Sequence, residues 1–262
     1  MITLTNTYTD FPKLPNQLNV VITGAMSGIG ASQVEAFLSH GHRVYTVDIQ
    51  TNADQLAKWQ AIYPETYYFQ ELDCSDVSAV SSFFQHITKD LSGIDVLCNT
   101  AGKLDGYVAL GDTNPDLWAD ILTHNLQSVF NMTKAALPYL LTNPTSRLIN
   151  MASIAGLTAG GGGIAYTTAK HAIVGFTKQM AYDYAGQGLV ANAIAPGAIM
   201  TPMNQADFVG DSPMADQVMA QTPAKRWASP DEVAALTLFL ASDQAAYMQG
   251  NTIPVDGGWL IR

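Results

Sequence analysis

Short, mainly apolar runs alternate with longer stretches in which apolar residues recur at helical spacing. The short runs are typical of buried strands and cover residues 18–23, 43–49, 66–72, 94–99, 147–152, 189–195 and 251–256. The helical stretches cover about 28–40, 54–63, 77–91, 115–141, 164–186 and 230–241, with a short helix within about 197–224. This alternation predicts right-handed βαβ units arranged around one parallel sheet.

No linker, repeat or low-complexity segment divides the chain, and the four glycines at 160–163 lie within the predicted domain. Residues 1–17 contain Pro12 and Pro15, which disfavour a long helix, so we expect a short N-terminal arm. We therefore predict one α/β domain over residues 18–262. It is a Rossmann-like, doubly wound parallel sheet of about seven strands flanked by helices. Ligands of such folds bind at the carboxyl ends of the strands.

Composition narrows the function further. Of the 262 residues 48% are apolar and 13% are charged, which favours a large buried core. The net charge of −10 disfavours nucleic acids and anionic membranes as partners. Cys74 and Cys98 have no zinc-site spacing, so we expect free thiols, no metal site and a cytoplasmic location. The first residues lack a basic start and an apolar core, and no apolar run has membrane-spanning length, so we expect neither signal peptide nor membrane span.

The first strand, turn and helix contain TGAMSGIG at residues 23–30, with Gly24, Gly28 and Gly30 spaced as G-x3-G-x-G. Gly24 permits a tight turn, Gly28 lets the backbone approach a pyrophosphate, and Gly30 lets helix and strand pack closely. The start of the helix would then face the phosphates. The motif predicts a dinucleotide site, with an ordinary βα turn as the alternative.

Asp48 ends the second predicted strand, where a carboxylate would accept hydrogen bonds from ribose hydroxyls and repel a 2′-phosphate. The following Ile49, Gln50 and Thr51 include no basic residue. Ser27 stands in the turn where a basic residue could have held that phosphate. The pattern therefore favours NAD(H) over NADP(H). The alternative is that Asp48 only caps the next turn.

Later strands end in residues that fit the same ligand. Asp73, beside Cys74, could accept from the adenine amino group. The small residues of NTAG at 99–102, with Asn99, Ala101 and Gly102, would let the chain pass the adenosine ribose. For each of them, a role in a turn is the alternative.

The stretch AYTTAK places Tyr166 and Lys170 one helical turn apart, on the same face. A neighbouring ammonium group favours the phenolate and lowers the pKa of a tyrosine, which could then transfer protons near neutral pH. The alternative is an exposed pair on a helix surface.

Over about residues 18–262, the sequence resembles the single-domain branch of the short-chain dehydrogenase/reductase family. The resemblance rests on TGAMSGIG, Asp48, Asp73, NTAG, Asn125 in HNLQSVF, Ser153 in NMASIAG, Tyr166 and Lys170 in YTTAK, and Pro196-Gly197 in IAPGAIMTP. Ser153 precedes Tyr166 by 13 residues, as in many members of the family.

The resemblance implies catalytic roles for four residues. Tyr166 would be the general acid for carbonyl reduction and the general base for alcohol oxidation. Lys170 would hold the nicotinamide ribose and keep the pKa of Tyr166 low. Ser153 would hydrogen-bond the substrate oxygen, and Asn125 would position a water between Lys170 and solvent. Ser153 capping a turn, and Asn125 satisfying a helix kink, are the alternatives.

The resemblance also implies a substrate lid at about residues 198–225, a small-molecule substrate and a homotetramer. The remaining expected cofactor contacts are Ile29, Ile49, Met151, Pro196, Gly197, Ile199 and Thr201.

Within the family, the chain is most similar to the 3-oxoacyl-carrier-protein reductase-like group, on a pattern that includes SPDEVAALTLFLASD and the ending GNTIPVDGGW. Asn131 and Gln187 stand where such reductases often have arginines for the acidic carrier, which favours a free small carbonyl or secondary alcohol instead. The four glycines before Tyr166 suggest an open or mobile wall of the site. Alternatives are a carrier-protein reductase using NADPH, an epimerase or dehydratase of the longer branch, and a non-catalytic dinucleotide sensor.

Overall fold

The computed structural model describes residues 14, 17–89, 91–207 and 213–262. The expected N-terminal arm at 1–17 lies outside the described residues except for residues 14 and 17. Part of the expected lid, residues 208–212, also lies outside them.

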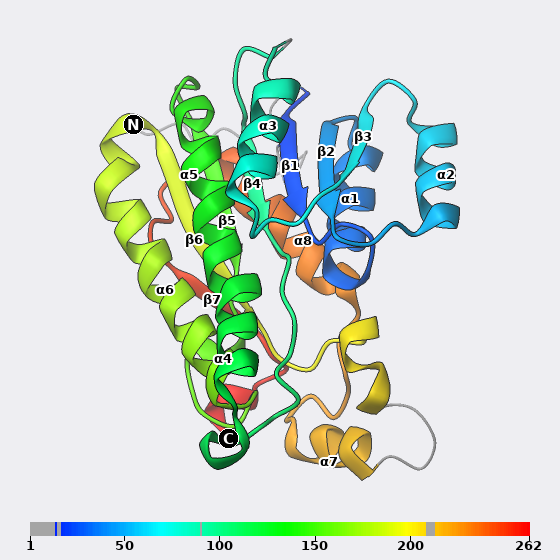
Figure 1. The fold of residues 1–262 in the computed structure, drawn as a ribbon, viewed down its shortest axis with the longest axis vertical. Coiled ribbons are helices and arrows are strands. Elements are labelled where there is room, and N and C mark those ends of the chain that lie inside the picture. The colour runs from blue at the N-terminus through cyan, green and yellow to red at the C-terminus, as the bar shows by residue number, and fades with distance from the viewer. Residues whose placement is uncertain (1–13, 15–16, 90, 208–212) are drawn as a thin grey trace, which may run out of the picture.

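Seven strands form one sheet in the order β3-β2-β1-β4-β5-β6-β7, and every neighbouring pair is parallel (Figure 1). The strands are β1 (Asn19–Thr23), β2 (Arg43–Asp48), β3 (Tyr67–Glu71), β4 (Val96–Asn99), β5 (Ser146–Met151), β6 (Leu189–Pro196) and β7 (Thr252–Val255). The prediction of a doubly wound parallel sheet of about seven strands is confirmed.

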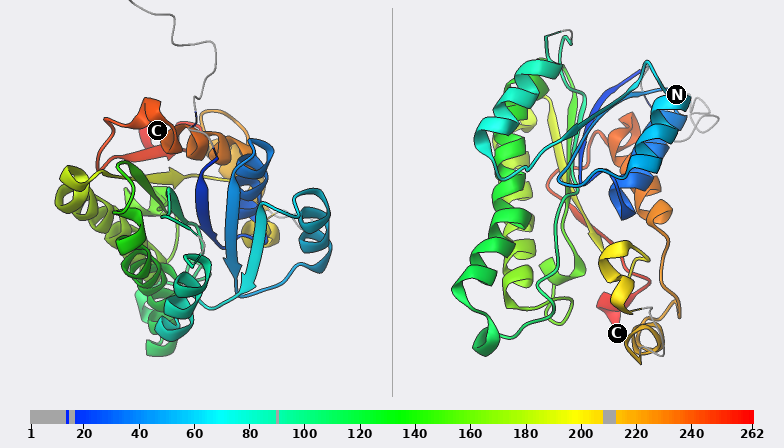
Figure 2. Two further views of the ribbon diagram at one scale, coloured as in Figure 1. Left: turned by 90° about the horizontal axis from the view of Figure 1, so that it is seen from above. Right: turned by 45° about the vertical axis from the view of Figure 1, so that its right-hand side comes forward.

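Helices cover both faces of this sheet (Figure 2). One face carries α3 (Val77–Ile87), α4 (Pro115–Leu122), α5 (Ser128–Leu140) and α6 (Ile164–Tyr184). The other carries α1 (Gly28–Ser39) and α8 (Pro230–Ala241), with α2 (Ala53–Ile62) at the β3 edge and α7 (Pro213–Gln221) beyond the strand ends. Between the helix layers β4, β5 and β6 are buried at every residue, as their apolar sequences require, whereas the edge strands β3 and β7 are partly exposed.

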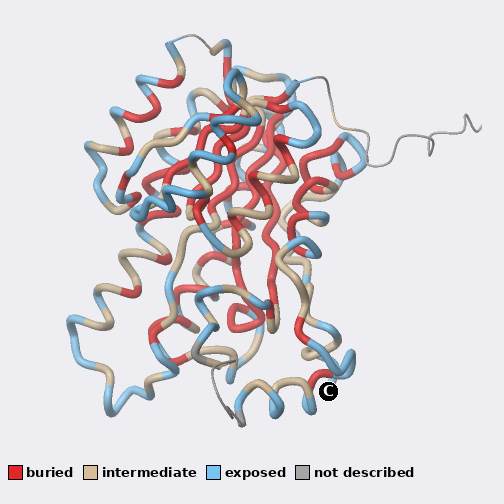
Figure 3. Tube along the Cα trace, turned by 90° about the vertical axis from the view of Figure 1, so that its right-hand side faces the viewer, coloured by how far each residue is buried: buried red, intermediate tan, exposed pale blue. Residues whose placement is uncertain are grey.

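Side chains of the sheet form two main cores. Val20, Ile22 and Val44 pack toward α1 and α8, whereas Val21 and Leu97 pack toward α3, α5 and α6. Successive side chains of β1 therefore alternate between the two cores, as the pleat of a strand requires. Figure 3 shows the buried strands at the centre of the molecule, surrounded by more exposed helices.

The helix predicted over 115–141 is interrupted. α4 ends at Leu122, a π-helical segment covers Thr123–Gln127, and α5 begins at Ser128. A π-helical insertion turns nearby side chains away from the positions a regular helix would give them. Asn125 lies at the centre of this segment.

β1 pairs with β2 on one side and with β4 on the other, so the chain order reverses at β1. The two crossovers leave in opposite directions, which opens a crevice at the carboxyl ends of these strands. None of the helices in the described part of the chain combines the length and apolar character needed to cross a membrane.

Candidate active site

A cavity of about 870 Å³ lies at the carboxyl ends of the strands and extends from the β1–α1 turn to Trp259. All the predicted site residues except Asn99 line it. They are Gly24, Ser27, Gly28, Ile29, Gly30, Asp48, Ile49, Asp73, Cys74, Ala101, Gly102, Asn125, Met151, Ser153, Tyr166, Lys170, Pro196, Gly197, Ile199 and Thr201.

Two glycines of the β1–α1 turn are required by close backbone approach. Gly24 has a φ of +65°, and a Cβ there would lie 2.8 Å from the Cα of Ala101. A Cβ on Gly30 would overlap the carbonyl oxygen of Gly24. The turn therefore packs against the chain after β4, as expected for Gly24 and Gly30.

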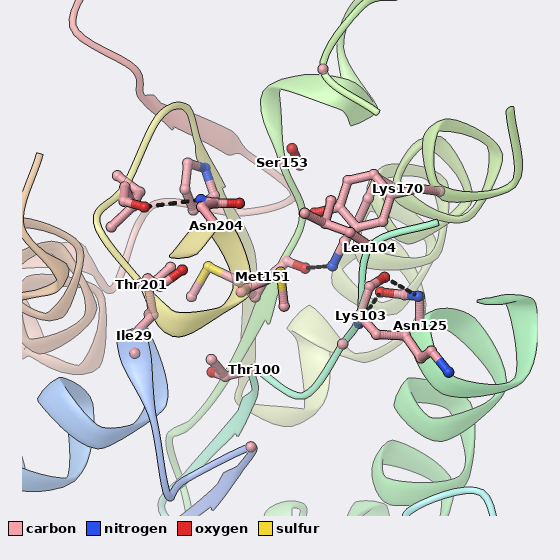
Figure 4. A pocket seen from close by; sticks show the side chains of 18 of the residues that line it. Ile29, Thr100, Lys103, Leu104, Asn125, Met151, Ser153, Lys170, Thr201 and Asn204 are labelled. Atoms are coloured by element: carbon pink, nitrogen blue, oxygen red, sulfur yellow. Dashed lines mark hydrogen bonds between the residues drawn. The ribbon is translucent and has the colours of Figure 1, made fainter. Parts of the chain in front are cut away.

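Gly28 begins α1 with a φ of +52°, and a Cβ there would lie 3.1 Å from the Thr201 side chain. The missing side chain therefore lets the start of α1 pass close to Thr201, and Figure 4 shows Thr201 beside Ile29. Ser27, Gly28 and Ile29 also line the cavity, and the free N–H groups at a helix start favour an anion there.

Asp48 braces this turn with its carboxylate. Oδ2 accepts from the Met26 N–H at 2.9 Å, and Oδ1 accepts from the Gln50 N–H at 3.1 Å. Asp48 therefore caps the turn that follows it, as in the alternative, but it does not do only that, since the same carboxylate also lines the cavity. Each oxygen retains a lone pair for a further donor.

Asp73 and Cys74 lie on the cavity wall after β3. Burial opposes ionisation of Asp73. The hydrogen bonds from Ser75, together with the charge of the nearby His124, outweigh burial and lower the pKa of the carboxyl. Burial, assisted by the charges of Asp73 and Asp48, raises the pKa of the Cys74 thiol to about 12. Cys74 is therefore an unreactive thiol at neutral pH.

Asn99 does not line the cavity. Its Nδ2 donates to Thr133 Oγ1 and Asn150 Oδ1, each at 2.9 Å, and Asn150 in turn donates to Thr177 Oγ1 at 2.9 Å. These bonds join β4 and β5 to α5 and α6 in the interior. The prediction that Asn99 contacts the cofactor is not supported, because its amide is used in this network.

Tyr166 and Lys170 project from the first two turns of α6. The Lys170 Nζ lies 5.4 Å from the centroid of the Tyr166 ring. It donates to the carbonyl oxygen of Met151 at 2.8 Å, the dashed contact beside Met151 in Figure 4. Both side chains are buried, with exposed fractions of 8% and 3%, so the alternative of a surface pair is wrong.

Burial dominates the ionisation of this pair. It raises the pKa of Tyr166 to about 12, against a hydrogen bond from Ser153 that lowers it. It also lowers the pKa of Lys170 to about 8. The expectation that Lys170 lowers the pKa of Tyr166 is therefore wrong for the protein alone. The ammonium is directed at Met151, and desolvation of the phenolate outweighs its field.

Ser153 follows β5 and also lines the cavity. Its Oγ accepts from the Ala155 N–H at 3.1 Å, so it caps the short turn Ile154–Gly156, as the alternative reading proposed. The same hydroxyl forms the hydrogen bond with Tyr166 that opposes the rise in the tyrosine pKa. Two hydroxyl groups thus meet in one wall of the cavity.

Asn125 is fixed by three hydrogen bonds within the interrupted helix region. Its Oδ1 accepts from the Lys103 N–H at 3.2 Å, and its Nδ2 donates to the carbonyls of Lys103 and Ile121 at 2.9 and 3.0 Å. The bond to Ile121 joins the Asn125 side chain to the last turn of α4. Asn125 therefore ties the chain after β4 to the helix, as Figure 4 shows.

The glycines at 160–163 form a closer wall than predicted. A Cβ on Gly162 would lie 2.5 Å from the Tyr166 ring, and one on Gly161 would lie 3.2 Å from Ala155. Only Gly160 of the run has open space around its Cβ position. The run therefore lets the chain pass close to the Tyr166 ring.

Comparison with known proteins decides the family. The family model described as enoyl-(acyl carrier protein) reductase matches residues 24–260. The chain belongs to the short-chain dehydrogenase/reductase family. As a member, it is a nucleotide-dependent oxidoreductase acting on CH–OH groups.

This short-chain dehydrogenase/reductase is 35% identical over 254 residues to the 3beta-hydroxysteroid dehydrogenase 2 of Eggerthella lenta, covering 95% of the chain and 96% of that protein. It is 32% identical to the 3-oxoacyl-[acyl-carrier-protein] reductase FabG of Thermotoga maritima, with coverages of 92% and 97%. The solved structure of ElxO with NADP bound superposes with a TM-score of 0.86 at 26% identity, covering 94% of this chain and all of that one.

The cavity of this short-chain dehydrogenase/reductase also includes residues beyond the predicted catalytic and cofactor contacts. Gln217, Val218 and Gln221 of α7 belong to the lid expected at about 198–225. The others come from the chain after β4, the π-helical segment, the connection before α8 and the last residues, and include Leu104, Tyr107, His124, Trp227, Trp259 and Arg262. The Arg262 guanidinium stacks 3.2 Å from the Trp259 ring and donates to Gln221 Oε1 at 2.6 Å. No role is predicted from the sequence for those that lie outside the expected lid.

Proposed function

We propose that this oxidoreductase transfers a hydride between NAD(H) and a small carbonyl or secondary alcohol, with Tyr166 as the proton donor or acceptor. One observation carries the proposal. The Tyr166 and Ser153 hydroxyls and the Lys170 ammonium line the same cavity as the glycine turn and Asp48. Proton transfer and cofactor binding can therefore occur in one continuous space.

The residues of the cavity fit a dinucleotide. The part of the cavity at the start of α1, lined by Gly24, Gly28 and Ala101, can hold a pyrophosphate close to the backbone. Asp48 and Asp73 provide carboxylates for ribose and adenine donors. Lys170 would reach the nicotinamide ribose, with its ammonium already held near that wall by Met151.

The nicotinamide supplies the hydride chemistry when bound. For reduction, Ser153 and Tyr166 donate hydrogen bonds to the substrate oxygen, where negative charge develops. Tyr166, with a pKa of about 12, is protonated at neutral pH and gives its proton to that oxygen. Lys170 then stabilises the phenolate with its positive charge. For oxidation, the Tyr166 phenolate removes the hydroxyl proton.

Asp48 supports the choice of NAD(H). Its carboxylate would accept from ribose hydroxyls and would repel the 2′-phosphate of NADP. The next cavity residues, Ile49 and Gln50, offer no positive charge. ElxO was solved with NADP bound, so the preference of this chain calls for a direct test.

A 3-oxoacyl-carrier-protein reductase using NADPH is the second candidate, favoured by the likeness to FabG. Asn131, which stands at one of the positions expected for carrier-binding arginines, is buried and donates to the carbonyls of Cys74 and Ser75 at 3.1 and 3.0 Å. A buried amide used in this way offers nothing to an acidic carrier. A free small carbonyl therefore remains our first choice.

We further propose a cytoplasmic homotetramer. Both cysteines are free and buried, which suits a reducing compartment. Phe130 on α5 and Tyr182 on α6 are 48% and 84% exposed, and such side chains suit contacts between copies. Sedimentation equilibrium of the purified protein should give the mass of four chains; the mass of one chain would contradict this.

The cofactor proposal is tested by Asp48→Asn, which keeps the size and one acceptor oxygen but removes the charge. We expect the ratio of kcat/KM for NADH to that for NADPH to fall about 10-fold or more, since a hydrogen bond to a charged group contributes roughly 1.5–3 kcal/mol. Initial rates with a short 3-oxoacyl thioester and with small ketones and diketones measure this. Asp54→Asn, at an exposed acid in the first turn of α2, is the control.

Turnover with NADPH alone by the unsubstituted protein would contradict the choice of NAD(H) and favour the second candidate. Tight NADH binding without turnover of any carbonyl would instead favour a dinucleotide sensor.

A further inference from the structure

Asp105 is a buried carboxylate for which the proposed mechanism has no role. It lies in the connection between β4 and α4, and its exposed fraction is 4%. It does not line the cavity. In the described part of the chain, no Lys or Arg lies within ion-pair distance of it, and its partners are backbone N–H groups.

Two of these N–H groups belong to the start of α6. Asp105 Oδ1 accepts from Gly163 at 2.8 Å, and Oδ2 accepts from Tyr166 at 2.9 Å. The first N–H groups of a helix have no acceptor within the helix, and Gly163 at the N-cap has no side chain to provide one. Asp105 therefore caps α6 from a distant part of the sequence.

The packing around Gly163 shows how close this approach is. A Cβ on Gly163 would lie 2.5 Å from Asp105 Oδ2 and 2.5 Å from the backbone nitrogen of Val108. The Ile164 N–H also donates to the Val108 carbonyl at 3.1 Å. The connection after β4 and the first turn of α6 are thus held as one unit, and Tyr166 lies in that turn.

The third N–H group belongs to Tyr107, which donates to Asp105 Oδ1 at 3.1 Å. Tyr107 has a φ of +60°, a backbone conformation that residues other than glycine rarely adopt. Its side chain is 44% exposed and lines the cavity. A strained residue persists when its surroundings hold it, and the Asp105 bond is one such constraint.

We propose that Asp105 is a positioning residue of the reaction, whose carboxylate sets the backbone of both tyrosines that line the substrate end of the cavity, Tyr166 and Tyr107. The role rests on the proposed function, because it concerns the placement of the proton donor. Displacing a reacting group by about 1 Å can lower a rate roughly 100-fold, so an anchor at the Tyr166 backbone has a measurable effect on turnover.

The charge of Asp105 also acts on the Tyr166 phenol. The groups that face this phenol are Tyr107 and Asp105 from the connection after β4, Ser153 after β5, and Lys170 on α6 itself. Burial is the main cause of the raised pKa of Tyr166, and the charges of Tyr107 and Asp105 act in the same direction. Removing the Asp105 charge should therefore lower the pKa of Tyr166.

Three variants test this role in the full-length protein. Asp105→Ala removes both acceptor oxygens and with them all three hydrogen bonds, and we expect kcat to fall about 100-fold with the Kd for NADH unchanged within about 2-fold. Asp105→Asn keeps one acceptor oxygen without the charge. It should retain more activity than Asp105→Ala, and its pH profile for alcohol oxidation should move to lower pH. Asp112→Asn, at an exposed acid of the same connection, should leave kcat and the profile unchanged.

Hydrogen exchange gives a readout that needs no substrate. Asp105→Ala should speed exchange of the amides at residues 163–166, and Asp112→Asn should not. Unchanged exchange there would overturn the inference, whether or not the protein turns over any carbonyl.

Tyr166→Phe is measured alongside to separate the two proposals. Normal turnover by Tyr166→Phe would refute the proposed function itself. If Tyr166→Phe is inactive, then normal kcat in Asp105→Ala, or an unshifted pH profile in Asp105→Asn, would overturn the role of Asp105 alone.

Discussion

At the scale of single residues, desolvation controls the chemistry of Tyr166 and Lys170. Burial favours the neutral form of each group, so the pKa of the phenol rises to about 12 and that of the amine falls to about 8. At neutral pH the phenol is protonated and the amine is still mainly charged. The pair is therefore prepared for carbonyl reduction, in which Tyr166 gives up a proton beside a positive charge.

These shifts predict opposite pH dependence for the two directions. Reduction uses protonated Tyr166, which persists below its raised pKa, so the rate should be flat from about pH 6 to 7 and fall through about pH 8 as Lys170 loses its proton. Oxidation uses the phenolate, whose fraction rises about 10-fold per pH unit below the pKa. Initial rates in both directions at saturating substrate measure this. Oxidation that is flat over the same range would contradict the assignment.

The residues that carry chemistry could be predicted from sequence because motifs mark them, but their environments could not. Tyr166 and Lys170 lie one turn apart as expected, yet only the structure shows that both are buried. Asn99 stands in a motif, but its amide is used in an interior network. Asp105 belongs to no motif, and a sequence does not show which acid of a connection will be buried.

At the scale of elements, the interrupted helix is the feature that shapes the site. The π-helical segment Thr123–Gln127 between α4 and α5 brings Asn125 to the chain after β4. Gly102 passes directly beside it, since a Cβ there would lie 2.6 Å from Asn125 Oδ1 and 3.6 Å from Lys170 Nζ. The absence of a side chain at Gly102 lets this chain, the helix and Lys170 meet.

Gly102→Ala should therefore disturb both stability and turnover. Asn125 is held by three hydrogen bonds and has little freedom to move aside, so we expect a loss of about 1–3 kcal/mol in the free energy of unfolding. We also expect kcat to fall roughly 10-fold or more, because Asn125 and the chain after β4, which line the cavity next to Lys170, are displaced. Denaturant titration and initial rates measure the two effects.

Gly111→Ala is the matched control, because a Cβ at Gly111 would meet nothing within 4 Å. Equal losses in both variants would show that the contact at Gly102 is not the cause.

The positions of the elements could be predicted closely, because hydrophobic spacing fixes which residues face the sheet. β2 and α8 match their expected ranges within one residue. The interruption between α4 and α5 could not be predicted, because apolar spacing continues through 115–141 and no proline or glycine marks the break. Its cause is tertiary, in the hydrogen bonds that Asn125 makes to Lys103.

At the scale of the whole molecule, the strand order gathers the parts of the site at the carboxyl ends of the strands. The reversal at β1 opens the crevice, β2 brings Asp48, β4 brings Gly102, and β5 brings Ser153. α6 brings Tyr166 and Lys170 to the same cavity. The overall architecture could be predicted because alternating strands and helices allow few arrangements. The wall formed by α7 falls within the lid expected at about 198–225, but the wall formed by Trp259 and Arg262 could not be predicted, since it depends on how distant segments pack.

Tyr166→Phe tests the central claim most directly, because it removes one hydroxyl from a buried ring and leaves the cavity otherwise unchanged. We expect the Kd for NADH to stay within about 2-fold and kcat for carbonyl reduction to fall about 10²- to 10⁴-fold, the usual contribution of a general acid. Tyr182→Phe, at an 84% exposed position on the same helix, should behave like the unsubstituted protein. Near-normal turnover by Tyr166→Phe would show that the proton comes from another group and would contradict the proposed mechanism.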